Sequence, residues 1–170
     1  MELNEVLIDL FGRVGEHVHE AVEGLDAEML RTPPEPGTNP IGWLIWHVAR
    51  GEDYQIAEVS GQEQVWTKGD WARSFGVTPD PNNMGYGHSW PEVMAIRPDS
   101  ADALIDYYDA VAARTRPFLE KLTPKDLDGI VDRNWDPPVT MGVRLISIAD
   151  DEIQHSGQAV YARGMLERRR

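Results

Sequence analysis

Apolar residues recur at three- and four-residue steps along much of the chain, which is the signature of amphipathic helices. Near the start, one such stripe consists of Leu3, Leu7, Leu10, Val14, Val18, Ala21 and Leu25. The same spacing predicts a second helix from about 40 to 60, a third from about 101 and a fourth over 140–166. Four helices of about 20 residues each favour an all-α fold, a four-helix bundle.

Residues with strong backbone preferences set the expected ends of these helices. Asn39 is expected to cap the second helix, with Pro40 at its first position. The third helix should begin after Ser100, and Pro117 should kink its last turns or end it early. An Asp-Pro-Pro run at 136–138 is expected to break the chain before the fourth helix.

The segment from Gly61 to Pro98 does not follow the helical pattern and is rich in Gly, Pro, Asn and aromatic residues. A capping box formed by Ser89 and Glu92 predicts one short helix within it. Loops of this length are usually functional or disordered, and the tryptophans of this segment argue against disorder. We therefore expect a long ordered loop between the second and third helices that covers one end of a single domain, residues 1–170.

Composition narrows the classes of partner. The 16 basic residues are outnumbered by 29 acidic ones, giving a formal net charge of −13. Such a chain repels phosphate backbones and anionic lipid, so we expect neither nucleic-acid nor membrane binding. The absence of cysteine excludes disulfides and thiol nucleophiles supplied by the chain. Because no signal peptide or apolar run of about 18 residues is present, we expect a soluble cytoplasmic protein.

A histidine on the fourth helix is the first candidate for chemistry. With His155 at 0° and about 100° per residue, Ile148 and Leu166 lie within about 20° of it, so His155 is expected in the middle of the apolar face. Asp151 falls near −40° and Glu152 near 60°, about one turn before the histidine. We expect Asp151 to pair with His155 on the buried face and Glu152 to lie at its edge. A structural ion pair and a metal site both explain a buried carboxylate beside an imidazole.

A second histidine favours the metal site. His47 on the second helix lies about 120° from the main apolar stripe, among Trp43, Leu44 and Tyr54, so it is expected to face a second buried surface. If the two helices are adjacent, His47, Asp151 and His155 form a set of two histidines and one carboxylate with open positions. Such a set suits Zn²⁺, Fe²⁺, Ni²⁺ or Mn²⁺ and leaves room for water or substrate.

Two further residues are candidates for catalysis. Glu52 falls inside the apolar sector of the second helix, where it could orient His47 or join a salt bridge. His88, in the long loop, could reach over the site as an acid, a base or a substrate contact, or could simply cap the loop. No pattern of nucleophilic serine chemistry or of phosphate binding is present.

At these residues the chain resembles the DinB/YfiT-like superfamily of metal-binding four-helix bundles. The family pattern places a histidine in the middle of its second helix, as in NPIGWLIWHVARGED around His47, and HxxxHxGQ on its fourth. Here DEIQHSGQ, beginning at Asp151, matches that second motif except at its first position. Asp151 therefore either serves as a carboxylate ligand or marks a loss of metal affinity. The similar metal-binding domain of mycothiol-dependent maleylpyruvate isomerases, which uses a His plus ExxxH set, is a parallel for the first alternative.

The resemblance implies an enzyme that uses a divalent metal (Zn, Ni or Fe) and a low-molecular-weight thiol such as mycothiol as co-substrate, as an S-transferase or isomerase acting on a small molecule. It also implies a homodimer, and the fourth helix has a second apolar strip that could pack against a neighbour or another helix: Ile146, Ala149, Ile153 and Val160. Two alternatives stay open. One is a metal-free bundle that binds a small molecule or protein partner under the Trp-rich loop, and the other is a degenerate family member kept for dimerisation.

Overall fold

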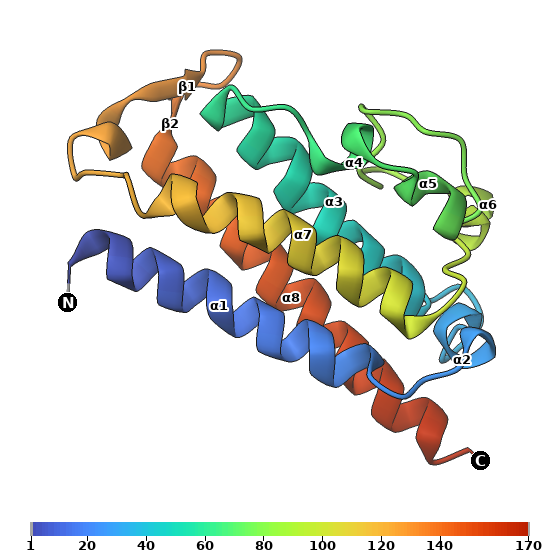
Figure 1. Ribbon diagram of the computed structural model, residues 1–170. Coiled ribbons are helices and arrows are strands. Elements are labelled where there is room, and N and C mark those ends of the chain that lie inside the picture. The colour runs from blue at the N-terminus through green and yellow to red at the C-terminus, as the bar shows by residue number, and fades with distance from the viewer. Residues whose placement is uncertain (1, 170) are drawn as a thin grey trace.

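Four long helices form the body of the protein in the computed structural model, which describes residues 2–169 (Figure 1). They are α1 (Leu3–Val22), α3 (Ile41–Ser60), α7 (Ala101–Leu119) and α8 (Met141–Glu167). Both α1 and α3 pack against α7 and against α8, so the helices form a ring in the order α1, α7, α3, α8. The predicted all-α four-helix bundle is confirmed.

The helix ends follow the capping residues of the sequence closely. The hydroxyl of Ser100 accepts a hydrogen bond from the Ala103 amide at the start of α7, as expected of an N-cap. The prediction for α3 is wrong by one residue, because Pro40 itself is the N-cap and the helix begins at Ile41. Pro117 does not end α7 early, because the helix continues past it to Leu119.

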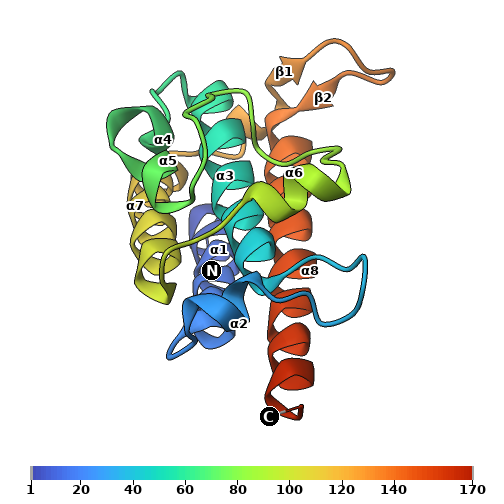
Figure 2. The ribbon, with the colours of Figure 1, turned by 90° about the vertical axis from the view of Figure 1, so that its right-hand side faces the viewer.

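Residues 61–98 form an ordered layer over α3, which we call the cover segment (Figure 2). It contains three short helices, α4 (Val65–Lys68), α5 (Trp71–Ser74) and α6 (Trp90–Ala95). The capping box predicted at Ser89 is present at the start of α6. Trp66, Phe75 and Val93 of this segment are buried in the main core. The expected ordered loop between the second and third bundle helices is therefore confirmed.

The remaining elements are short and had no clear periodic signal. They are α2 (Ala27–Arg31), the 3-10 helix η1 (Asp126–Asp128) and the strands β1 (Ile130–Asp132) and β2 (Val139–Thr140). The two strands pair antiparallel, with Ile130 opposite Thr140. The predicted break at 136–138 falls in the connection between them, directly before α8 begins.

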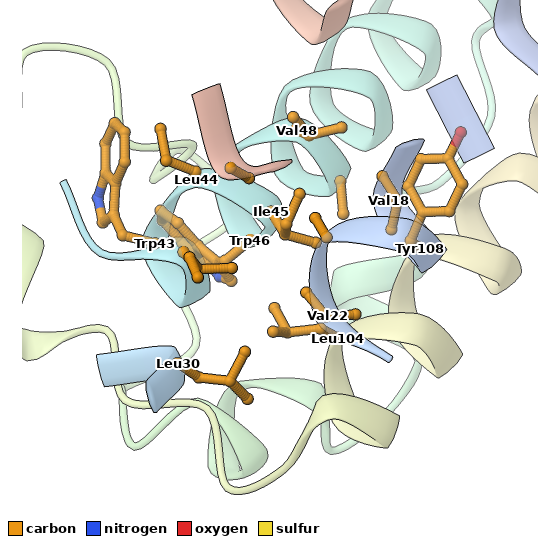
Figure 3. Packing of buried hydrophobic residues seen from close by; sticks show 14 of the residues in the cluster. Val18, Val22, Leu30, Trp43, Leu44, Ile45, Trp46, Val48, Leu104 and Tyr108 are labelled. Atoms are coloured by element: carbon orange, nitrogen blue, oxygen red, sulfur yellow. The ribbon is translucent and has the colours of Figure 1, made fainter. Parts of the chain in front are cut away.

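Helix α3 is buried almost all round, which is unusual for a bundle helix. Every residue from Ile41 to Asp53 is buried, because α7 and α8 cover one side and the cover segment the other. Figure 3 shows Ile45 of this helix packed toward Val22 of α1 and Leu104 of α7. The indole of Trp46 instead contacts Trp66 and His88 of the cover segment. Any polar side chain in this part of α3 is thus held in a defined position inside the protein. Within the described residues, no helix is both long enough and apolar enough to cross a bilayer.

Candidate metal centre

The three residues predicted as metal ligands come together at the seam between α3 and α8. His47 of α3 and Asp151 and His155 of α8 each offer a ligand atom, and these atoms all lie within 4.8 Å of one another. No other group of three or more His, Cys, Asp or Glu side chains in residues 2–169 meets this condition. The two imidazole rings are 4.7 Å apart between centroids and nearly perpendicular, at 75°.

Backbone carbonyls fix the orientation of both imidazoles. Nδ1 of His47 lies 2.5 Å from the carbonyl oxygen of Met84, and Nδ1 of His155 lies 2.8 Å from the carbonyl oxygen of Asp151. A carbonyl oxygen can only accept, so Nδ1 of each ring carries the proton and donates it. Nε2 of each ring is then left as the atom that can bind a metal, the arrangement found for most metal-binding histidines.

Asp151 supplies the negative charge of the site. Its Oδ2 lies 3.4 Å from Nε2 of His47, and its Oδ1 lies 3.4 Å from Nδ1 of His155. Partial burial raises the pKa of this carboxyl, but its interactions with His47 and His155 outweigh burial, so that the pKa of Asp151 is lowered. The group is therefore a carboxylate at neutral pH, which is the form that a metal requires.

The three donors fit a divalent ion. Metal–ligand distances of about 2.0–2.1 Å place two ligand atoms on one ion at most about 4.2 Å apart, so small side-chain rotations close the observed 4.8 Å. The indole of Trp43 stacks on His47 at 4.9 Å and 11°, and so forms an apolar wall. The side chain of Asp151 remains 41% exposed, which leaves one side of the site open to a small molecule.

The cover segment supplies the carbonyl that orients His47. Gly85, next to Met84, has a φ of +94°, and a Cβ there would lie 2.9 Å from Nδ1 of His47. Only glycine allows this close approach of the loop to the imidazole. Fully buried Arg50 fastens the same loop, since its Nε donates to the Asn83 carbonyl (3.0 Å) and an Nη donates to the Pro81 carbonyl (3.1 Å).

Comparison with known proteins agrees with the observed fold. The sequence profile of the DinB superfamily matches residues 10–159. The chain belongs to the DinB superfamily.

A solved structure shows the same fold over nearly the whole length of the chain. The crystal structure described as the conserved protein of locus from Enterococcus faecalis has a TM-score of 0.88 and 31% sequence identity. The alignment covers 97% of this chain and 97% of that one. A comparison with curated proteins finds no match.

His88 of this DinB superfamily member lies in the cover segment with both ring nitrogens engaged. Its Nδ1 accepts from the indole N–H of Trp43 at 3.2 Å, and its Nε2 lies 2.8 Å from Oδ1 of Asn83. Burial lowers the pKa of His88, in keeping with a neutral ring that accepts at one nitrogen and donates at the other. These contacts tie the loop to Trp43, the residue that stacks on His47, and match the loop-capping alternative.

The acids of α8 are arranged differently from the prediction. Glu152, expected at the edge of the helix, is the buried one at 1% exposure, whereas Asp151 is half-exposed. Small residues on the Glu152 side, Ala149 and Ser156, pack tightly against the bundle and shift the buried arc by about 60° away from His155. His155 therefore stands at the margin of the core and beneath the cover segment instead of in the middle of the apolar face.

Glu52 is buried at 1% exposure, as its place in the apolar sector predicted. It does not orient His47, because the Met84 carbonyl holds Nδ1 of that ring. Its carboxyl instead neighbours those of Glu152 and Asp53 and the hydroxyl of Thr115. Sequence reasoning missed Arg50, Met84 and Gly85, although an arginine three residues after His47 on a buried helix was a usable signal.

Proposed function

We propose that the protein is a divalent-metal-dependent enzyme in which His47, Asp151 and His155 hold the ion. The observation that carries the proposal is the state of the two imidazoles. Each donates its Nδ1 proton to a backbone carbonyl, at 2.5 Å and 2.8 Å, and each thereby presents Nε2 as a lone-pair donor beside a carboxylate.

We further propose that the reaction is thiol transfer or isomerisation. When bound, a divalent ion lowers the pKa of a coordinated thiol or water and so yields a nucleophile at neutral pH. The chain has no cysteine, so the thiol comes from a low-molecular-weight co-substrate such as mycothiol or bacillithiol. Three protein ligands leave a position free for such a molecule.

The chain's own side chains contribute binding and positioning. Trp43 excludes water from one face of His47 through its stacked indole. The half-exposed Asp151 marks the side from which a small-molecule substrate reaches the centre. The Met84 carbonyl maintains the direction of Nε2 of His47 while the substrate binds and leaves.

We also propose that the active form is a homodimer that uses the outer face of α8. Of the four residues of the predicted strip, Ala149 and Val160 pack within the bundle, while Ile146 and Ile153 remain 65% and 38% exposed. Light scattering should give twice the chain mass for the wild type and a smaller mass for Ile146→Asp. A wild-type monomer at micromolar concentration would contradict the dimer.

The thiol proposal can be tested by spectroscopy on cobalt-substituted protein. Adding mycothiol or bacillithiol to the Co²⁺ form should produce a sulfur-to-cobalt charge-transfer band, because a thiolate becomes a ligand. The band should be absent in His155→Ala, which lacks a metal ligand. If the metal is bound but no such thiol perturbs the cobalt spectrum, the thiol reaction is wrong while the metal centre stands.

A further inference from the structure

A cavity lies away from the metal centre, in the seam between α1 and α7, which run side by side in Figure 1. Its volume is about 270 Å³, just below the range of about 300–1,000 Å³ typical of ligand sites, so it suits a small molecule. Its walls are mostly apolar or small, and they include Ile8, Phe11, Gly12, Gly15, Ala112 and Leu119. None of its lining residues belongs to the His47, Asp151, His155 set.

Two buried oxygens that line this cavity lack partners. Glu52 and Thr115 are only 1% and 2% exposed. Oε2 of Glu52 and Oγ1 of Thr115 have no partner of good hydrogen-bond geometry among the described residues, although the Glu52 carboxyl lies close enough to the Thr115 hydroxyl and to Glu152 to interact with both. Buried polar atoms in folded proteins are almost always paired, so two unpaired oxygens beside one cavity indicate a donor that enters from outside.

A second buried carboxyl lies behind this pair. Glu152 neighbours Glu52, is equally buried, and its carboxyl interacts with that of Glu52. Burial raises the pKa of Glu52. The charge of Arg114 acts on Glu52, and one Nη of this arginine lies 3.0 Å from Oδ1 of Asp53, while its Nε has no hydrogen-bond partner among the described residues.

The character of the missing partner follows from these groups. A metal ion is disfavoured, because neither Glu52 nor Glu152 belongs to a set of three ligand side chains within the described part of the chain. The walls favour an apolar body, and the oxygens require donors rather than acceptors. A ligand group with one positive charge and several N–H donors can pair with the carboxyl and the hydroxyl at the same time.

We propose that the α1–α7 cavity binds a small primary ammonium compound with an apolar body, whose ammonium donates to Oε2 of Glu52 and Oγ1 of Thr115. The body of the ligand then contacts Phe11 and Leu119. This site is separate from the metal centre and does not depend on it. The ammonium supplies a countercharge for the buried Glu52 carboxyl.

Gly12 offers a way to close the cavity without touching its polar floor. It lines the cavity from within α1, and a Cβ at this position would meet no other heavy atom within 4 Å. Gly12→Leu should fill the cavity while favouring the helix, since leucine has a much higher helix propensity than glycine. This variant therefore complements Glu52→Gln and Thr115→Val, which change the buried polar groups themselves.

Calorimetric titration with benzylamine, and with benzyl alcohol as a neutral match, tests the proposal. Benzylamine, protonated at pH 7.5, should bind the wild type at one site, and benzyl alcohol at least tenfold more weakly. Glu52→Gln should weaken benzylamine binding at least tenfold, Thr115→Val less, and Gly12→Leu should abolish it. His155→Ala should bind benzylamine like the wild type, which separates this site from the metal centre.

Three results would overturn the proposal. The first is that neither benzylamine nor smaller primary amines such as butylamine bind the wild type. The second is equal binding of benzylamine and benzyl alcohol, which would remove the role of the charge. The third is unchanged benzylamine binding in a folded Gly12→Leu protein, which would place the amine outside this cavity.

Discussion

The two sides of α3 differ in how their buried carboxyl groups are paired. On the covered side, which faces the cover segment, Asp53 accepts hydrogen bonds from the Val65 and Trp66 amides and the Tyr107 hydroxyl, and it pairs with Arg50. On the inner side, which faces the α1–α7 cavity, the adjacent Glu52 has an unpaired oxygen although it is equally buried. Neighbouring residues of one helix thus belong to a satisfied network and to an unsatisfied one.

Helix α8 repeats this division. Asp151 turns toward the covered side, where two histidines stabilise its charge and lower its pKa, while Glu152 turns inward and has its pKa raised by burial. Burial alone therefore does not identify a functional residue. A satisfied network holds the fold and positions the metal centre, whereas unpaired groups beside a cavity indicate a ligand.

The largest effect should come from breaking the covered network at Arg50. Arg50→Met leaves a buried carboxylate with one cation fewer and removes the donors to the Asn83 and Pro81 carbonyls. We expect the free energy of unfolding to fall by about 3–5 kcal/mol in urea denaturation. Arg13→Met, which breaks an exposed pair with Asp9, is the matched control and should have almost no effect. Equal small changes in both variants would refute the structural role of the network.

A smaller effect should appear when the loop is pushed away from His47. Gly85→Ala places a Cβ 2.9 Å from Nδ1 of His47 and so displaces the Met84 carbonyl. We expect metal affinity to fall by about 10- to 100-fold in a competition titration, the usual cost of losing a group that orients a ligand. Gly87→Ala is the control, because Gly87 also has a positive φ of +73° but no atom within 4 Å of its added Cβ. Equal losses in both variants would point to backbone strain alone.

The stability that Glu52 contributes on the inner side of α3 should depend on pH in the opposite sense from that of a salt-bridged carboxylate. Burial raises the pKa of Glu52 above its ordinary 4.5, so the folded protein holds this proton more tightly than the unfolded chain does. Its stabilising contribution is fully present below pH 4.5 and is lost as the pH rises through the raised value.

Glu52→Gln should therefore remove part of the decline in stability above pH 4.5. The neutral amide can also donate to Glu152, which the carboxylate cannot. Thermal unfolding from pH 5 to pH 8 measures the effect, with the exposed Glu16→Gln as control. A decline as steep as that of the wild type would show that Glu52 does not titrate in this way.

The sequence was most informative where a signal is local. Helical periodicity located all four bundle helices, and Ser100 capped α7 as its chemistry requires. The pairing of His47 with Asp151 and His155 followed from one histidine on each of two helices and from the family motif. These features depend on spacing along one helix, which a helical wheel represents directly.

Features that depend on contacts between residues far apart along the chain could not be predicted from local patterns. The helical wheel predicted a buried Asp151 because the apolar face was defined by the large apolar residues. In the structure, the small residues Ala149 and Ser156 pack closely against the bundle, and Glu152 is buried instead. The Met84 carbonyl reaches His47 from 37 positions away along the chain, and no local pattern announces a backbone acceptor. In the sequence, Gly85 is one of several glycines in the loop. A glycine is required there because the imidazole of His47 lies against it in the fold.

Elemental analysis of protein purified without a histidine tag tests the central claim most directly. After incubation with Zn²⁺ and desalting, the wild type should retain about one ion per chain, and so should Glu152→Gln, whose side chain faces the other way. His155→Ala should retain almost none while keeping its helical circular dichroism. A wild type that retains no zinc, nickel, iron or manganese, or a folded His155→Ala that retains as much as the wild type, would contradict the account.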